Sequence, residues 1–290
     1  MDCMVRNRKA ASLAKGIFAA LPTAFDQAGN VDEKALCFLV RNLLQKGVEG
    51  FYVGGSTGEC FLLSEAERKE VLEIVLDAAE GKVPVIAHVG AMSTIVAVSL
   101  AQHAAACGAS AVSATPPFYF SYNLDKIYSY YADIAEASGL PVLVYNIPAF
   151  SGRNFGHNEI DRLLDIPGVA GLKHTSMNLY ELERIRVKNP DKILFSGYDE
   201  VFLPALVSGA DGMIGSTVNL MPELFLDIKK LFILGDIAAA QKLQAKVNSV
   251  IEALAGGLFP RRLNMRLALP GCPAANAESH FFQFLAKRWN

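Results

Sequence analysis

The sequence has few charged residues and little net charge. Of its 290 residues, 19% are charged, and the formal net charge is −2. Nucleic-acid binding calls for a basic domain or stripe, so we expect no nucleic-acid partner. Intrinsic disorder is also excluded, because 52% of the residues are hydrophobic and such a chain can bury a large core.

The sequence also lacks any paired-cysteine motif. Its five cysteines are odd in number and widely spaced: Cys3, Cys37, Cys60, Cys107 and Cys272. This spacing argues against a disulfide framework and against a cysteine-ligated zinc. We expect reduced, mostly buried thiols and a cytoplasmic protein. His88 and His174 lack the spacing of known metal motifs, so no metal is expected there.

A continuous apolar run long enough to cross a membrane is missing as well. Residues 83–124 contain no Asp, Glu, Lys or Arg, but Pro84, His88 and Pro116 interrupt the apolar character. A membrane span needs about 20 nearly continuous apolar residues. The first 16 residues have no apolar core of the kind found in secretory signals. The sequence therefore predicts neither a membrane span nor a secretory signal.

What the chain does have is a regular alternation of short apolar runs and amphipathic segments. Helix signals include Asp32 as an N-cap and a capping box of Ser64 and Glu67. The apolar runs do not alternate with polar residues, which is typical of parallel strands buried on both faces. The predicted strands are 16–20, 50–53, 83–89, 111–114, 141–145, 169–174, 192–196 and 212–215.

Eight strands, each followed by a helix, predict an α/β fold of the (β/α)8 TIM-barrel type with additional C-terminal helices. A doubly wound sheet could give the same alternation, but no GxGxxG follows the first strand. We expect a barrel over 16–220 and a last barrel helix with a helical extension over 221–290. No low-complexity linker divides them, so the two parts are expected to form a single domain.

Chemistry in a TIM barrel sits at the C-terminal ends of the strands. Lys173 is the most informative residue there, because it lies inside an apolar strand. Burial disfavours an ammonium and leaves a neutral amine, which is the nucleophile for a Schiff base with a ketone. Two structural roles of Lys173 are the alternatives: it could pair with a carboxylate, or its side chain could extend to the barrel rim.

Other strand ends carry hydroxyls, glycines and carboxylates. The Gly54–Glu59 loop could hold a carboxylate through Ser56 and Thr57, or could be merely a tight turn. Tyr145, taken as the last residue of its strand, could move a proton or could be a core aromatic. Asp199 and Glu200 could accept hydrogen bonds from substrate hydroxyls, although N-capping is the alternative for Asp199.

Five separate motifs together resemble the family of N-acetylneuraminate lyases and dihydrodipicolinate synthases, which are class I pyruvate aldolases. They are GGSTGE at 54–59, YNIP at 145–148, GLKHTS at 171–176, GYDE at 197–200 and GADGMIGST at 209–217. The likeness spans about Gly16 to Val250. Ser56 and the GYDE motif resemble the sialic acid lyase branch. The C-terminal part after Pro260 departs from the family pattern.

The resemblance implies reversible cleavage of N-acetylneuraminate to pyruvate and N-acetylmannosamine. It implies that Lys173 forms the Schiff base and that Tyr145 moves the proton, with no cofactor or metal. Tyr119 matches an aromatic residue that subunits of this family exchange, usually within homotetramers. The implied substrate-binding residues are Ser56, Thr57, Thr175, Gly197, Asp199, Glu200 and Ser216.

Two other functions stay open on the sequence alone. The first is an aldolase or dehydratase of the same family that acts on another 2-keto-3-deoxy sugar acid, or, less favoured, a dihydrodipicolinate synthase. The second is a barrel that binds a keto acid without turnover. Lys173, Tyr145 and the Ser-Thr loop occurring together argue against a pure binder.

Overall fold

Eight parallel strands close into a barrel in the computed structural model, which describes residues 13, 15–26 and 28–255. Each strand pairs with its neighbours in chain order, and the last pairs with the first. The strands are β1 (Ile17–Ala20), β2 (Gly50–Val53), β3 (Val85–His88), β4 (Ala111–Ala114), β5 (Val142–Asn146), β6 (Val169–His174), β7 (Ile193–Ser196) and β8 (Gly212–Gly215).

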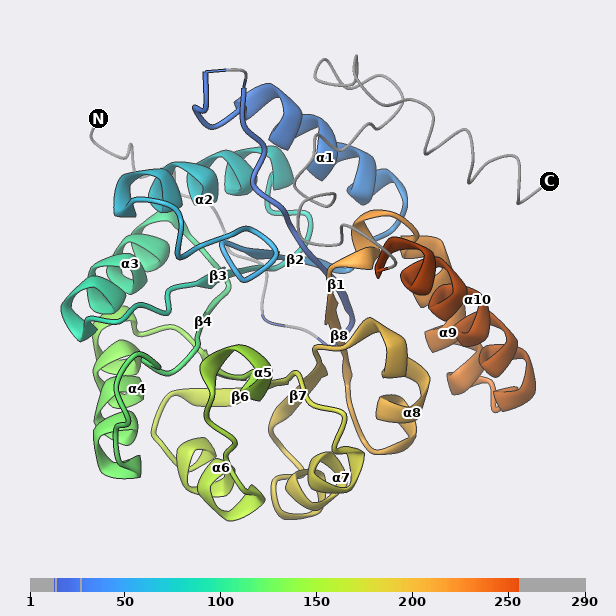
Figure 1. Ribbon diagram of the computed structural model, residues 1–290. Helices are drawn as coiled ribbons and strands as arrows, with labels where there is room; N and C mark the ends of the chain where they lie inside the picture. Colours follow the sequence, from blue (N-terminus) through green and yellow to red (C-terminus); the bar gives the residue numbers. More distant parts are fainter. Residues whose placement is uncertain (1–12, 14, 27, 256–290) are drawn as a thin grey trace.

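Helices surround this inner ring, as the view along the barrel axis shows (Figure 1). The main helices are α1 (Glu33–Gln45), α2 (Glu65–Ala79), α3 (Thr94–Cys107), α4 (Leu124–Ser138), α6 (His157–Leu164), α7 (Leu179–Lys188), α8 (Phe202–Val207), α9 (Pro222–Ile233) and α10 (Ile237–Ala255). Shorter ones are α5 (Pro148–Ser151), η1 (Asp199–Val201) and η2 (Thr217–Asn219). The (β/α)8 barrel prediction is confirmed.

Local signals account for most of the helix boundaries. The Asp32 carboxylate accepts a hydrogen bond from the backbone N–H of Ala35, and Ser64 and Glu67 form the reciprocal capping box. Several strand bounds differ from the predicted ones by one or two residues; β3, for example, was expected over 83–89 and spans Val85–His88. Strand β5 extends one residue beyond Tyr145, to Asn146, and helix α5 was not anticipated. Pro148 opens α5, since its fixed φ suits the first position of a helix.

The interior of the barrel is filled by inward-facing side chains from the strands. Phe18, Ile86, Phe195 and Ile214 are almost completely buried there, and Leu13 packs against the same cluster. A second, larger core lies between the strands and the surrounding helices. Because the interior is filled by apolar side chains, any polar group that projects into it requires an explanation.

The two C-terminal helices of the described chain pack on the barrel beside the loop that follows β7. The side chain of Gln244 on α10 donates to the backbone carbonyls of Asp199 and Glu200. That 221–290 forms one domain with the barrel stays a prediction, because 256–290 lie outside the described residues. Cys3, Cys272 and the atypical segment 260–290 also lie outside them.

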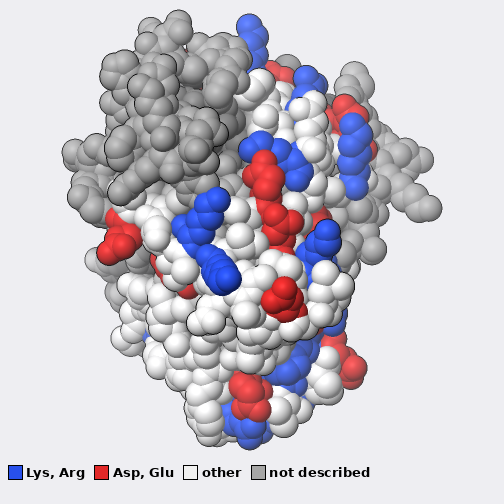
Figure 2. All heavy atoms as spheres, turned by 90° about the vertical axis from the view of Figure 1, so that its right-hand side faces the viewer, with Lys and Arg blue, Asp and Glu red and all other residues white. Residues whose placement is uncertain are grey.

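The described surface has no dominant charge on the side that carries α9 and α10. Acidic and basic side chains are interleaved there (Figure 2), in keeping with a net charge of −2. Within the part of the chain that the structure describes, no helix combines the length and apolar character needed to cross a membrane.

Candidate active site

Lys173 projects from β6 into the barrel and faces two aromatic rings. Its Nζ lies 4.2 Å from the centroid of the Tyr52 ring and 4.1 Å from that of the Tyr145 ring. The residue is only 4% exposed, so the alternative of a side chain reaching the rim is wrong. Among the described residues, no ion pair joins Lys173 to a carboxylate, and the Asp199 carboxylate affects its pKa only from a longer range.

Burial lowers the pKa of Lys173 to about 7, against a smaller opposing effect from the Asp199 carboxylate. An ammonium between two rings is held by their π faces, but this attraction does not replace the water that the buried group has lost. At neutral pH a large share of the side chain is therefore a free amine. That is the state a Schiff-base nucleophile needs.

Tyr145 lies beside Lys173 because the strand register places the two residues opposite each other on β5 and β6. Its hydroxyl lies 3.5 Å from the Ser56 Oγ, and its ring is buried. Burial raises the pKa of Tyr145 to about 12, while the hydroxyls of Ser56 and Thr175 partly oppose the rise. The phenol is therefore neutral at physiological pH and can accept one proton while donating another.

The loop after β2 brings two hydroxyls to the barrel mouth. Ser56 reaches Tyr145, and the Thr57 Oγ1 lies 2.7 Å from the Ser216 Oγ in the loop after β8. Gly54 has φ = 65°, so the tight-turn interpretation holds too. The turn and the site are one feature, because the loop that begins at this left-handed glycine carries both hydroxyls.

A buried network that sequence analysis missed holds this loop in place. The Gly54 carbonyl lies 2.9 Å from the His88 Nδ1, and the Thr115 N–H donates to the His88 Nε2 at 3.2 Å. A carbonyl can only accept and an N–H can only donate, so His88 carries its proton on Nδ1. Burial lowers the pKa of His88 well below its usual value, and the nearby Arg68 adds to this effect.

Arg68 completes that network from α2. Its guanidinium donates to the backbone carbonyls of His88 and Gly90, at 2.9 and 3.1 Å. The residue is buried. The only sequence signal was an arginine among the apolar positions of a helix, which is weak because arginine usually extends to solvent.

Asp199 does not cap a helix with its side chain, so the N-capping alternative is wrong. Residue 198 is the N-cap of η1, and no side-chain hydrogen bond caps that helix. The Asp199 Oδ2 accepts from the backbone N–H and the hydroxyl of Thr217, at 2.7 and 2.6 Å. Its Oδ1 is buried without a hydrogen-bond partner among the described residues. Burial raises the pKa of this carboxyl to about 6.

Of the remaining predicted site residues, Thr175, Gly197 and Glu200 belong to the strand ends around the same mouth, whereas Tyr119 lies apart from them. Thr175 is buried directly after β6, and a Cβ added at Gly197 would come within 1.8 Å of the Thr175 Oγ1. The Glu200 side chain is half-buried, and its backbone carbonyl accepts from Gln244 and Asn248. Tyr119 does not join this group. It is 76% exposed and packs edge-to-face on Phe120.

A cavity of about 270 Å³ opens beside Ser56 at the barrel mouth. Its walls come mainly from the loops after β2, β4 and β5, and include Cys60, Phe61 and Phe118. Burial raises the pKa of the Cys60 thiol to about 11, which keeps it protonated. The mouth thus offers space for a small molecule next to Ser56, whose hydroxyl contacts that of Tyr145.

Residues 13–280 match the Dihydrodipicolinate synthetase family. The chain belongs to that family. A curated family member, the N-acetylneuraminate lyase of Escherichia coli, is 48% identical over 241 residues, or 83% of this chain and 81% of the relative.

Several solved structures resemble this chain over most of its length. The N-acetylneuraminate lyase of Fusobacterium nucleatum superposes with a TM-score of 0.88 at 34% identity, covering 94% of this chain and 98% of that one. CdNal from Clostridium difficile, solved in complex with mannosamine, gives 0.87 at 35% identity and covers 90% of each chain. A sialic acid aldolase of Ruminococcus gnavus, solved as a catalytic lysine mutant, gives 0.81 at 35% identity, with 83% and 80% covered.

Proposed function

We propose that this protein is an N-acetylneuraminate lyase, a Schiff-base aldolase that reversibly cleaves N-acetylneuraminate to pyruvate and N-acetylmannosamine. The observation that carries the proposal is the Lys173 amine, buried against two tyrosine rings with its pKa lowered to about 7. The 48% identity to a named lyase supports the choice of substrate.

Lys173 supplies the electrophilic activation. Its neutral amine adds to the C2 ketone of the open-chain substrate, and loss of water gives a protonated imine. The positive imine draws the electron pair of the C3–C4 bond toward C3, so that this bond breaks to an enamine and an aldehyde. Protonation of the enamine at C3 and hydrolysis of the imine then release pyruvate and restore the amine. The class I aldolases of this family use a lysine in this way without a metal.

Tyr145 moves the proton that this cleavage releases. As the C3–C4 bond breaks, the C4 hydroxyl becomes an aldehyde and must lose its proton. With a pKa of about 12, Tyr145 is not a standing phenolate. It therefore accepts the C4 proton while passing its own toward Ser56 or the substrate carboxylate, and the Oγ–Oη distance of 3.5 Å supports that route.

We assign the orientation of the substrate to residues in the loops at the barrel mouth. Ser56 and Thr57 hold the carboxylate through hydroxyl and backbone N–H groups. The unpartnered Oδ1 of Asp199 supports a hydrogen bond from a substrate hydroxyl. Further contacts to the hydroxylated tail are assigned to Thr175, Gly197, Glu200 and Ser216.

We also propose a homotetramer that works in the cytoplasm, without a cofactor and without a nucleic-acid or membrane partner. The exposed aromatic segment Phe118–Phe120, which includes Tyr119, supports a subunit contact. Tyr119→Ala should shift the oligomer toward smaller species in analytical ultracentrifugation. An unchanged sedimentation coefficient would place the contact elsewhere.

Borohydride trapping with N-acetylneuraminate, followed by peptide mass mapping, tests the function. A reduced pyruvate adduct on Lys173 requires both imine formation and C3–C4 cleavage. If pyruvate alone traps but N-acetylneuraminate does not, the substrate is another 2-keto-3-deoxy sugar acid or the enzyme is a synthase. If neither traps, and Lys173→Ala still binds pyruvate, the protein is a binder and the Schiff-base proposal fails.

A further inference from the structure

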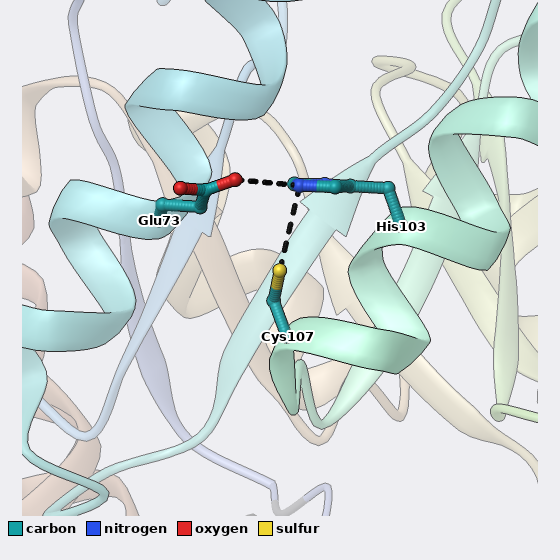
Figure 3. A group of neighbouring side chains, drawn as sticks. All are labelled: Glu73, His103 and Cys107. Atoms are coloured by element: carbon teal, nitrogen blue, oxygen red, sulfur yellow. Dashed lines mark hydrogen bonds and ion pairs between the residues drawn. The ribbon is translucent and has the colours of Figure 1, made fainter. Parts of the chain in front are cut away.

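Three ligand-type side chains converge outside the barrel, between α2 and α3. Glu73 projects from α2, while His103 and Cys107 project from α3 (Figure 3). The two α3 residues are four apart, which places them on one face of the helix, one turn from each other. Their ligand atoms all lie within 4.8 Å of one another. This is the only such group found among the described residues.

The contacts in this group meet at a single atom, the His103 Nε2. It lies 2.8 Å from a Glu73 carboxylate oxygen and 3.4 Å from the Cys107 Sγ. If Nε2 is protonated, it donates its single hydrogen to the Glu73 carboxylate and cannot accept one from the Cys107 thiol. An unprotonated Nε2 can accept from the thiol but repels the carboxylate. A cation, in contrast, accepts electron pairs from the carboxylate, the imidazole and the thiolate together.

We propose that Glu73, His103 and Cys107 form a binding site for a zinc-type divalent cation. Carboxylate, imidazole and thiolate are all zinc ligands, and three protein ligands leave a fourth position for water. Tetrahedral bonds of normal length would place nitrogen and sulfur about 3.6 Å apart, and nitrogen and oxygen about 3.4 Å apart. The nitrogen–sulfur pair, at 3.4 Å, is already close to its value, whereas the nitrogen–oxygen pair, at 2.8 Å, has to lengthen by about 0.6 Å.

The burial of the three side chains suits such a site. The Glu73 side chain is 45% exposed and His103 15%, while Cys107 is buried at the base. The exposed carboxylate can therefore withdraw by about 0.6 Å without disturbing the core. Its exposed side also gives the ion and its water a route from solvent.

A neighbouring set of contacts between the same helices shows what an ordinary polar link looks like here. Lys69 pairs with Glu65 and donates to Ser99, which itself donates to Glu65. That link joins α2 to α3, and every member has a matching partner. Ser99 lies four residues before His103. The next turn of the same seam holds the Glu73–His103 pair, with the Cys107 thiol as a third group beside it.

The bound ion would fasten α2 to α3 and leave the barrel chemistry untouched. Binding requires a deprotonated thiol, so affinity should rise with pH. None of the three residues contributes to the interior site, so the proposal does not depend on the aldolase function. Zinc should raise the unfolding midpoint of the wild-type protein.

The test uses the full-length protein, stripped with chelator and titrated with Zn²⁺ and with Co²⁺. We expect one equivalent of zinc and, with cobalt, the charge-transfer absorption of a thiolate ligand. Cys107→Ser, His103→Gln and Glu73→Gln should each weaken binding by at least about tenfold, the lower end of the loss seen when metal-supporting groups are removed.

Two matched variants serve as controls. Cys37→Ser removes another thiol, on α1, and Glu70→Gln removes a neighbouring exposed carboxylate on α2. Both should bind zinc as the wild-type protein does, and Cys107→Ser should retain wild-type turnover of substrate. Zinc binding that survives in Cys107→Ser and His103→Gln, or no binding by the wild-type protein, would overturn the proposal.

Discussion

The reactivity of Lys173 toward a keto acid should level off just above neutral pH. Burial lowers its pKa from 10.5 to about 7. The neutral fraction of the amine is then about one eleventh at pH 6, one half at pH 7 and ten elevenths at pH 8. The rate of imine formation should rise about tenfold from pH 6 to pH 8 and then stay constant, because the amine is by then fully deprotonated.

An ordinary lysine gives a different curve. With its pKa at 10.5, the neutral fraction would rise about a hundredfold from pH 6 to pH 8 and keep rising about tenfold per unit toward pH 10. The assay is single-turnover reductive trapping of pyruvate, read from the mass of the Lys173 peptide at each pH. The height of the plateau gives the trapping rate of the fully neutral amine. The pH at which the rate reaches half of that height gives the pKa of the amine.

Asp199→Asn provides the matched variant for this titration. The Asp199 carboxylate raises the pKa of Lys173, so its removal should move the midpoint below that of the wild-type protein. A trapping rate that climbs steadily between pH 8 and pH 10 would refute the reasoning, since it would mean that the amine remains hydrated.

Three further outcomes follow from the site. His88→Ala should raise the KM for keto acids about fivefold or more, because the Gly54 carbonyl loses a buried partner worth about 1–3 kcal/mol; an unchanged KM in steady-state assays would show that the loop keeps its conformation without His88. Gly197→Ala should lower kcat while leaving the fold intact by circular dichroism, because its Cβ would displace the Thr175 hydroxyl; wild-type kcat would show that this hydroxyl is dispensable. Asp199→Asn should raise the free energy of unfolding at pH 7 by at most about 3 kcal/mol, since burial raises the pKa of the carboxyl from 3.8 to about 6 and its ionisation opposes folding. In urea titrations this gain should shrink as pH falls from 6 to below 4, where the carboxyl is protonated in both states, and a gain that persists at pH 3 would contradict it.

The sequence predicted the fold and the central residue because both leave a local signal. Continuous apolar runs indicate strands buried on both faces, and Ser64 with Glu67 marks a helix start within four residues. Lys173 was recognisable since a lysine inside an apolar strand violates the normal cost of burial. These features need no knowledge of which segments meet in space.

The parts that could not be predicted depend on contacts between distant segments. Thr57 and Ser216 are 159 residues apart, and the partner of Asp199 is Thr217 rather than its own helix. Tyr52 reaches Lys173 only because of how the barrel closes. Periodicity assigns each of these residues to a face but says nothing of its partner on another strand.

The apolar side chains that fill the barrel interior have a consequence for the order in which the products leave. Leu13 and Ile193 pack against the interior cluster, and Phe18, Ile86 and Phe195 occupy the space within it. On the proposed mechanism, a pyruvate held as an imine on Lys173 would have this packed interior behind it, and the amino sugar would lie between it and the mouth. The sugar must depart first, and in synthesis pyruvate must enter first. The mechanism is thus expected to be compulsory-ordered, with pyruvate competing directly against N-acetylneuraminate for the free enzyme.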